Sequence, residues 1–218
     1  MSWIVTATGR EHELSGSAAT HPDNVPSLGE IAHSLSQINR FTGHASRPYS
    51  VAEHSLLVLG FARYEYASAE LQFAALMHDA HEVITGDVAS PIKTEVGAAW
   101  EAFEWRHQHH MLQQYELLEV YTKHKALIKR WDLMALATER HQLTRFDAQN
   151  NRPWPILDTT GAAVHSVAGT NLNAEWRRMN TWETWAHVFE HQANMLQERM
   201  SIQRHEESLI KSRERSAA

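Results

Sequence analysis

An almost uninterrupted apolar segment in the first half of the chain leads directly into a group of histidines and acids. Residues 67–77 are mostly alanine, leucine, phenylalanine and methionine, and the sequence HDAHE follows at 78–82. A helix that is apolar on most sides has to be buried against other elements. The pattern therefore predicts a buried helix over residues 67–81 that delivers polar side chains at its end.

Most of the remaining chain also carries helical signals, which predict a mainly α fold. Ser27 with Glu30, and Ser50 with Glu53, form capping-box patterns ahead of apolar residues at helical spacing. Further helices are expected at residues 94–121, at residues 124–145, and from a cap at Asn173 to beyond Met200. Near the start, WIVTA and REHEL flank a Thr-Gly turn and predict a short β-hairpin over residues 3–14.

The length of 218 residues suits one domain with one core. We expect a hairpin and loop over residues 1–26, a metal-binding helical core over 27–146, an irregular excursion over 147–172, and a C-terminal helix and tail over 173–218. The apolar face of that last helix, with Trp182, Trp185 and Phe189, either packs on the core or forms a dimer seam. We favour a homo-oligomer, specifically a homodimer.

Composition excludes several classes of function. A net charge of -6 argues against a nucleic-acid partner, because such proteins carry a basic surface excess. The chain has no cysteine, which excludes disulfides, thiolate metal sites and cysteine nucleophiles. No apolar run approaches the ~18 residues of a membrane span. We therefore expect a cytoplasmic protein with no membrane partner.

The chain holds 16 histidines, so their positions matter more than their number. His54 lies within a predicted helix, and His78-Asp79 ends the next one. Two imidazoles with carboxylates from different helices can enclose a divalent cation. The opposing interpretation, an all-helical interaction protein with incidental histidines, stays open at this point.

Five other histidines invite a second-metal interpretation: His81, His107, His109, His110 and His141. His107 and His110 are three residues apart on a predicted helix, but the surrounding WRHQHHMLQQ offers no carboxylate frame. We therefore predict a solvated face and no second metal there.

Four ordered blocks strengthen the hypothesis of a metal site. They are INRF at 38–41, RPYSVAEHS at 47–55, MHDAHEVITGDVASPIK at 77–93 and KRWDLMALATER at 129–140. In these blocks the sequence resembles the HD-domain phosphohydrolases, specifically the small 5'-deoxynucleotidase and deoxynucleotide triphosphohydrolase branch of bacteria and their phages. The resemblance covers about residues 3–145 and implies an HD-type helical bundle in a bacterial or phage-infected cell.

The resemblance also implies a set of metal ligands, which are His54, His78, Asp79 and Asp132. This donor set suits one divalent transition metal, with Mn, Co, Zn, Fe and Ni all compatible, or Mg with a polyphosphate substrate. Without the resemblance, Asp132 would be interpreted as a helix-surface residue, although its apolar neighbours point to burial.

Further roles follow from the same blocks. Glu82 would help to activate the attacking water, Asp87 would support it, and Arg40 would contact the phosphate. Lys93 and Lys129 are candidate phosphate-binding cations, with ordinary surface charge as the alternative. Phe41 stands where this branch often carries tryptophan near the sugar, and its alternative is core packing. An aromatic ring there would disfavour a 2'-hydroxyl, but phenylalanine cannot donate a hydrogen bond.

The function expected from these residues is metal-dependent hydrolysis of the 5'-phosphate ester of a (2'-deoxy)nucleotide. The products would be a nucleoside and either phosphate or triphosphate. The alternative is a non-catalytic HD module that binds nucleotides for regulation, although such a module has no need for Glu82.

Overall fold

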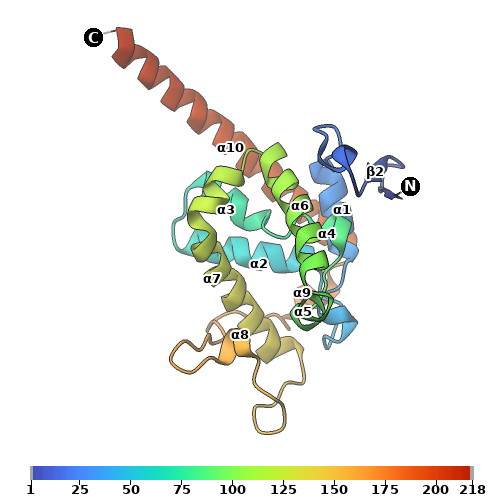
Figure 1. Cartoon of the computed structure of the whole chain (residues 1–218). Helices are drawn as coiled ribbons and strands as arrows, with labels where there is room; N and C mark the ends of the chain where they lie inside the picture. Colours follow the sequence, from blue (N-terminus) through green and yellow to red (C-terminus); the bar gives the residue numbers. More distant parts are fainter. Residues whose placement is uncertain (1, 217–218) are drawn as a thin grey trace.

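The computed structural model describes residues 2–216 and has a mainly α architecture with one short hairpin, as predicted (Figure 1). Strand β1 (Trp3–Val5) pairs antiparallel with β2 (Glu11–Glu13), with Trp3 opposite Glu13. A 3-10 turn, η1 (Ser17–Thr20), follows the hairpin. Among the described residues, no helix is both long enough and apolar enough to cross a membrane.

Four helices enclose most of the core: α1 (Leu28–Gln37), α2 (Val51–Tyr64), α3 (Ala69–Leu76) and α10 (Trp182–Ser216). The two predicted helix starts are confirmed, because Ser27 accepts a hydrogen bond from the Glu30 amide and Ser50 accepts one from the Glu53 amide. Helix α3 has no solvent-facing stripe, and its Phe73, Ala74 and Leu76 are fully buried. The first part of α10 lies along α1 and α3, and its C-terminal part extends away from the rest of the molecule (Figure 1).

The buried helix ends earlier than predicted. Helix α3 stops at Leu76, and residues 77–81 form turns before the short α4 (Glu82–Thr85). His78 and Asp79 therefore lie on a turn that follows the buried helix, where their side chains can point in directions that a continuous helix would not allow.

The helix expected over residues 94–121 is wrong as a single element. Helix α5 (Ser90–Val96) ends at Gly97, whose φ of +70° favours glycine, and α6 (Ala98–Gln114) begins directly after it. A second break follows at Glu116, with φ of +57°, so α7 (Leu118–Leu143) starts earlier than the expected residue 124. His124 is a non-helical position inside α7.

The segment after α7 is largely irregular, as expected, with one short helix, α8 (Pro155–Asp158). The predicted cap at Asn173 is wrong: a separate α9 (Glu175–Met179) follows that residue, and α10 begins only at Trp182. Phe189 is fully buried and packs in the core of its own chain, whereas Trp185, which is 8% exposed, lies outside that core with its ring 6.2 Å from the ring of Trp176.

Candidate metal centre

Two buried imidazoles face each other where the turn after α3 meets the first turn of α2. The Nε2 atoms of His54 and His78 lie 3.3 Å apart. The Nδ1 atoms point away: His54 Nδ1 lies 2.6 Å from Glu139 Oε1, and His78 Nδ1 lies 2.8 Å from the Ala75 carbonyl oxygen. Each ring is thus held by an acceptor on one nitrogen and presents the other to the same small space, as metal-ligating histidines do.

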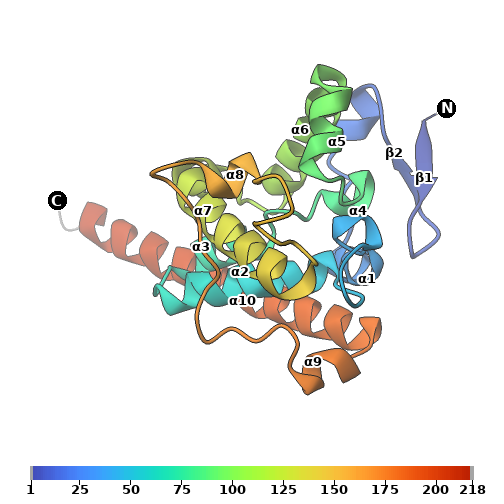
Figure 2. The same cartoon turned by 90° about the horizontal axis from the view of Figure 1, so that it is seen from below.

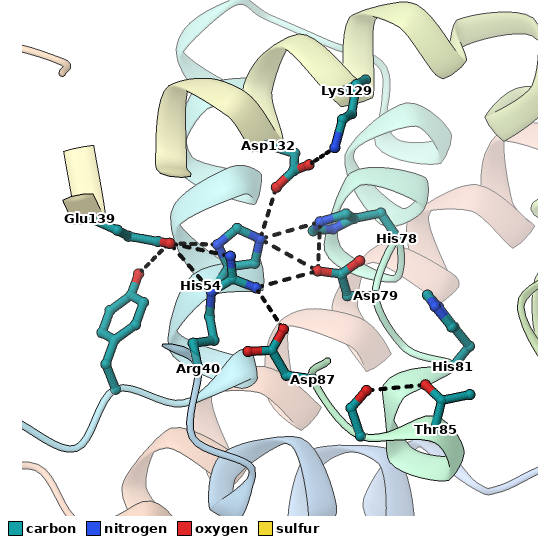
Figure 3. Close-up of polar contacts among 12 residues, drawn as sticks. Arg40, His54, His78, Asp79, His81, Thr85, Asp87, Lys129, Asp132 and Glu139 are labelled. Carbon is teal, nitrogen blue, oxygen red and sulfur yellow. Dashed lines mark hydrogen bonds and ion pairs between the residues drawn. The ribbon is translucent and has the colours of Figure 1, made fainter. Parts of the chain in front are cut away.

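Two carboxylates complete this group (Figure 3). Asp79 Oδ2 lies 3.1 Å from His78 Nε2 and 3.5 Å from His54 Nε2. Asp132, from α7, places Oδ1 3.4 Å from His54 Nε2. Ligand atoms of His54, His78 and Asp132 all lie within 4.8 Å of one another. The four residues predicted as ligands are therefore brought together from α2, the turn after α3, and α7.

Glu139 also belongs to this group, although the sequence motifs did not indicate it. It is fully buried on α7 and accepts hydrogen bonds from the Tyr49 hydroxyl at 3.0 Å and from Arg40 Nε at 3.3 Å, besides its contact with His54. Its position seven residues after Asp132, two helical turns along the same face, is the signal that could have identified it.

Arg40 lies at the edge of the cluster and is 8% exposed. Its guanidinium forms ion pairs with Glu139 at 3.3 Å, with Asp87 at 3.6 Å and with Asp79 at 3.8 Å. The next residue, Phe41, opens the 3-10 turn η2 (Phe41–Gly43) with φ of +58°, an uncommon value for a bulky side chain. This backbone conformation directly follows the residue expected to contact the phosphate.

Glu82 and Asp87 lie on the α4 side of the cluster. Glu82 is 3% exposed, and its Oε2 has no hydrogen-bond partner among the described residues. Burial first, then the neighbouring Asp79 and Asp87, raises the pKa of Glu82 well above its usual range. Burial also raises the pKa of Asp87, against the opposing effect of Arg40. Both predicted residues are thus close to the cluster and electrostatically tied to Asp79.

The two candidate lysines are engaged with carboxylates. Lys129 donates to Asp132 Oδ2 at 2.7 Å and is 53% exposed, whereas Lys93 pairs with Glu104. Phe41 is only partly buried, and its ring lies 6.3 Å from that of Trp154. Lys129 is thus next to a predicted ligand, and Lys93 is held toward α6 instead.

The electrostatics of the cluster call for positive charge. Burial and Arg40 oppose protonation of His54, but Glu139 and Asp132 outweigh them and raise its pKa to about 9. Burial alone would raise the pKa of the Asp79 carboxyl. His78, His54 and Arg40 outweigh that effect and hold this pKa well below its usual range. A site that draws a proton onto a fully buried imidazole is suited to a cation, and two nitrogens with two carboxylate oxygens fit a divalent transition metal.

The prediction of a solvated face at His107 and His110 is wrong. These residues are 2% and 5% exposed and lie under the N-terminal hairpin, together with the buried His12 of β2. We call these three residues the hairpin histidines. The residues neighbouring α6 in the sequence could not indicate this burial, because the segment that covers these histidines lies about ninety residues earlier in the chain.

Comparison with known protein families finds no match. An uncharacterized protein of Escherichia coli, YfdR, is 36% identical over 158 residues, which cover 72% of this chain and 80% of the relative. An uncharacterized protein of Rhodobacter capsulatus is 34% identical over 140 residues, which cover 60% of this chain and 71% of the relative. The chain thus belongs to the same protein family as YfdR.

Proposed function

We propose that this protein is a metal-dependent phosphohydrolase that cleaves the 5'-phosphate ester of a nucleotide, as the HD-domain resemblance implies. The observation that carries the metal part of the proposal is the orientation of the two imidazoles. His54 and His78 have their Nδ1 atoms on fixed acceptors and their Nε2 atoms 3.3 Å apart, beside Asp79 and Asp132. Imidazoles restrained in this way are oriented as ligands before a metal arrives.

Charge supports the same proposal. Five carboxyl groups gather around Arg40 and the two imidazoles: Asp79, Glu82, Asp87, Asp132 and Glu139. Buried carboxylates are costly unless they are paired or bind a cation. One divalent ion held by His54, His78, Asp79 and Asp132 would offset much of this excess. When bound, such an ion supplies a Lewis acid and lowers the pKa of a coordinated water.

The protein's own residues would then provide proton transfer and phosphate binding. Glu82 has a buried carboxyl oxygen without a partner and lies near Asp79, where it can accept a proton from the attacking water. Arg40 is held in place by Glu139, and its longer contacts to Asp79 and Asp87 leave N–H groups able to bind phosphate oxygens.

The nucleotide part of the proposal rests on the surroundings of Arg40. Phe41 and Trp154 form an aromatic pair beside it, which suits the sugar and base of a nucleotide. Hydrolysis at the 5'-oxygen would release a nucleoside with phosphate or triphosphate. A (2'-deoxy)nucleotide is the substrate class that we propose.

The test is a panel of ribo- and deoxynucleoside mono-, di- and triphosphates incubated with Mn²⁺, Co²⁺, Mg²⁺ or Zn²⁺, with products separated by chromatography. We expect nucleoside release with at least one metal and none with a chelator. Glu82→Gln preserves the size of the side chain, so it should bind metal normally and lose at least about 100-fold in kcat.

Three outcomes would contradict parts of the proposal. Nucleotide binding without turnover, under every metal, would support the regulatory alternative. Turnover within twofold of wild type in Glu82→Gln would show that the carboxyl does not activate water. Metal content below about half an ion per chain, without uptake on reconstitution, would remove the metal site itself.

A further inference from the structure

A pocket of about 300 Å³, separate from the candidate metal centre, lies where the end of α1 and the start of α2 meet the α9–α10 junction. Figure 2 shows α9 beside the start of α10, on the side of the molecule away from α5 and α6. The residues that line this pocket include none of the predicted metal ligands, nor Arg40, Glu82 or Asp87. It therefore needs a separate explanation.

One arginine and one glutamate in the pocket wall neutralise each other. Arg47 donates through Nη1 and Nη2 to both carboxylate oxygens of Glu53, at 2.8 and 2.7 Å. Its remaining N–H groups are directed to the carbonyl oxygens of Leu172 and Pro48. All five donors of Arg47 are thus used, so this residue shapes the wall and has no donor left for a ligand.

Two further arginines have donors to spare. Among the described residues, the Arg177 side chain hydrogen-bonds only through Nη1, to Glu53 Oε1 at 2.8 Å. The Arg178 side chain is exposed and makes no hydrogen bond or ion pair within the part of the chain that the structure describes, although its backbone amide donates to the Ala174 carbonyl. With Glu53 already balanced by Arg47, these two residues leave a local charge of about +2, which matches a phosphate dianion.

The other side of the pocket is aromatic. Trp185 and the 38%-exposed Trp182 line it, and the Arg177 guanidinium lies 5.8 Å from the Trp185 ring centroid. Asn39 and Asn180 also line it, and their side-chain amides have no partner among the described residues. A flat heteroaromatic ring could stack on the indoles and exchange hydrogen bonds with these amides.

We propose that this pocket is a second binding site, specific for a nucleoside monophosphate. Arg177 and Arg178 bind the phosphate, the two tryptophans contact the base, and the volume is at the lower end of the range for small-ligand sites. Glu53 of α2 lines the pocket, and the next residue along the helix is His54, a predicted metal ligand. A nucleotide bound here would therefore contact the same helix as the proposed active site.

The test is isothermal titration of the full chain, with chelator present to suppress hydrolysis, using adenosine 5'-monophosphate, adenosine and inorganic phosphate as probes. We expect the monophosphate to bind, inorganic phosphate to compete with it, and adenosine alone to bind at least roughly tenfold more weakly. Arg178→Ala should weaken monophosphate binding roughly tenfold, because it removes a charged donor without disturbing any bond within the protein.

Matched controls separate this site from general charge and from the proposed active site. Arg199→Ala removes an exposed arginine farther along α10, and Trp105→Ala removes an exposed tryptophan of α6. Both control variants should bind the monophosphate as wild type does. Trp182→Ala, by contrast, should weaken that binding. Asp79→Ala should retain the binding that depends on Arg178.

Equal effects of Arg178→Ala and Arg199→Ala would overturn the proposal, as would monophosphate binding that Asp79→Ala abolishes and Arg178→Ala leaves intact. Neither result depends on turnover. Failure of the hydrolysis proposal and failure of this one are therefore distinguishable.

Discussion

The metal-centre histidines and the hairpin histidines are equally buried but have opposite surroundings. His54 and His78 face Asp79, Asp132 and Glu139. His12, His107 and His110 are surrounded by one another, by backbone carbonyl groups and by the amide of Asn24. Each hairpin histidine also has one ring nitrogen without a hydrogen-bond partner.

The two environments drive protonation in opposite directions. The pKa of His54 rises to about 9, because Glu139 and Asp132 outweigh burial and Arg40. Burial lowers the pKa of His12 and of His107 to about 4, with further lowering from nearby basic groups. Buried histidines thus attract a cation only where carboxylates accompany them, and the hairpin histidines serve as neutral packing residues instead.

The largest expected difference between the regions is in metal binding. Asp79→Ala removes the carboxylate that lies closest to His78, so we expect metal affinity to fall by more than about 100-fold. His107→Gln changes a histidine that has no carboxylate frame and should alter affinity less than twofold. Titration of the chelator-treated chain with Mn²⁺ or Co²⁺ measures both affinities. Similar losses of metal affinity in the two variants would contradict the proposed difference between the two groups of histidines.

Glu139→Gln tests the residue that orients the predicted ligand His54 through its Nδ1 atom. The substitution keeps an acceptor for His54 but removes the buried charge that also holds Arg40 and Tyr49. We expect a 10- to 100-fold loss of metal affinity, the usual effect of altering a ligand-orienting partner. An affinity within twofold of wild type would show that Glu139 only fills space.

The pH dependence of stability separates the regions in another way. The pKa values of His12 and His107 are lower in the folded chain, about 4, than their ordinary value of 6.5. As pH falls below about 6.5, the unfolded chain therefore binds protons that the folded chain does not, and stability decreases until about pH 4. We expect each histidine to account for about 3 kcal/mol of this loss.

Urea unfolding of wild type and His107→Gln between pH 7 and pH 4 measures this effect. The variant should lose less free energy of unfolding over that interval, and the exposed His141→Gln should behave as wild type. Parallel curves for His107→Gln and wild type would mean that His107 binds its proton equally well in the folded and the unfolded chain, so that folding does not lower its pKa.

The smallest expected effect concerns Lys129. The Lys129 side chain, which pairs with Asp132, is 53% exposed. Exposed ion pairs contribute at most about 1 kcal/mol to stability. Lys129→Ala should therefore change metal affinity less than about fivefold. A rise in KM for a nucleotide of more than about tenfold would instead support the predicted contact with phosphate.

The sequence predicted those parts of the molecule whose signals are local. The helix starts at Ser27 and Ser50, the hairpin, and the buried helix before His78 were all correct in kind, although only Ser27 forms the full capping box. Element boundaries were less accurate where single backbone positions decide them, as at Gly97 with its positive φ and at Glu116. Such positions interrupt a helical pattern without changing its apolar spacing.

The site was partly predictable for a similar reason. The four proposed ligands were identified from ordered blocks, and the structure brings them together. Glu139 was missed because an acid near the end of a helix usually faces solvent, and only the fold places it against Arg40. The burial of His107 was missed because it depends on the distant hairpin.

The most direct test of the metal centre is anomalous diffraction from crystals grown with Mn²⁺. We predict one strong peak, within about 2.5 Å of donor atoms from at least three of His54, His78, Asp79 and Asp132. A chain that takes up no ion at these residues, or whose peak lies among His12, His107 and His110, would contradict this prediction.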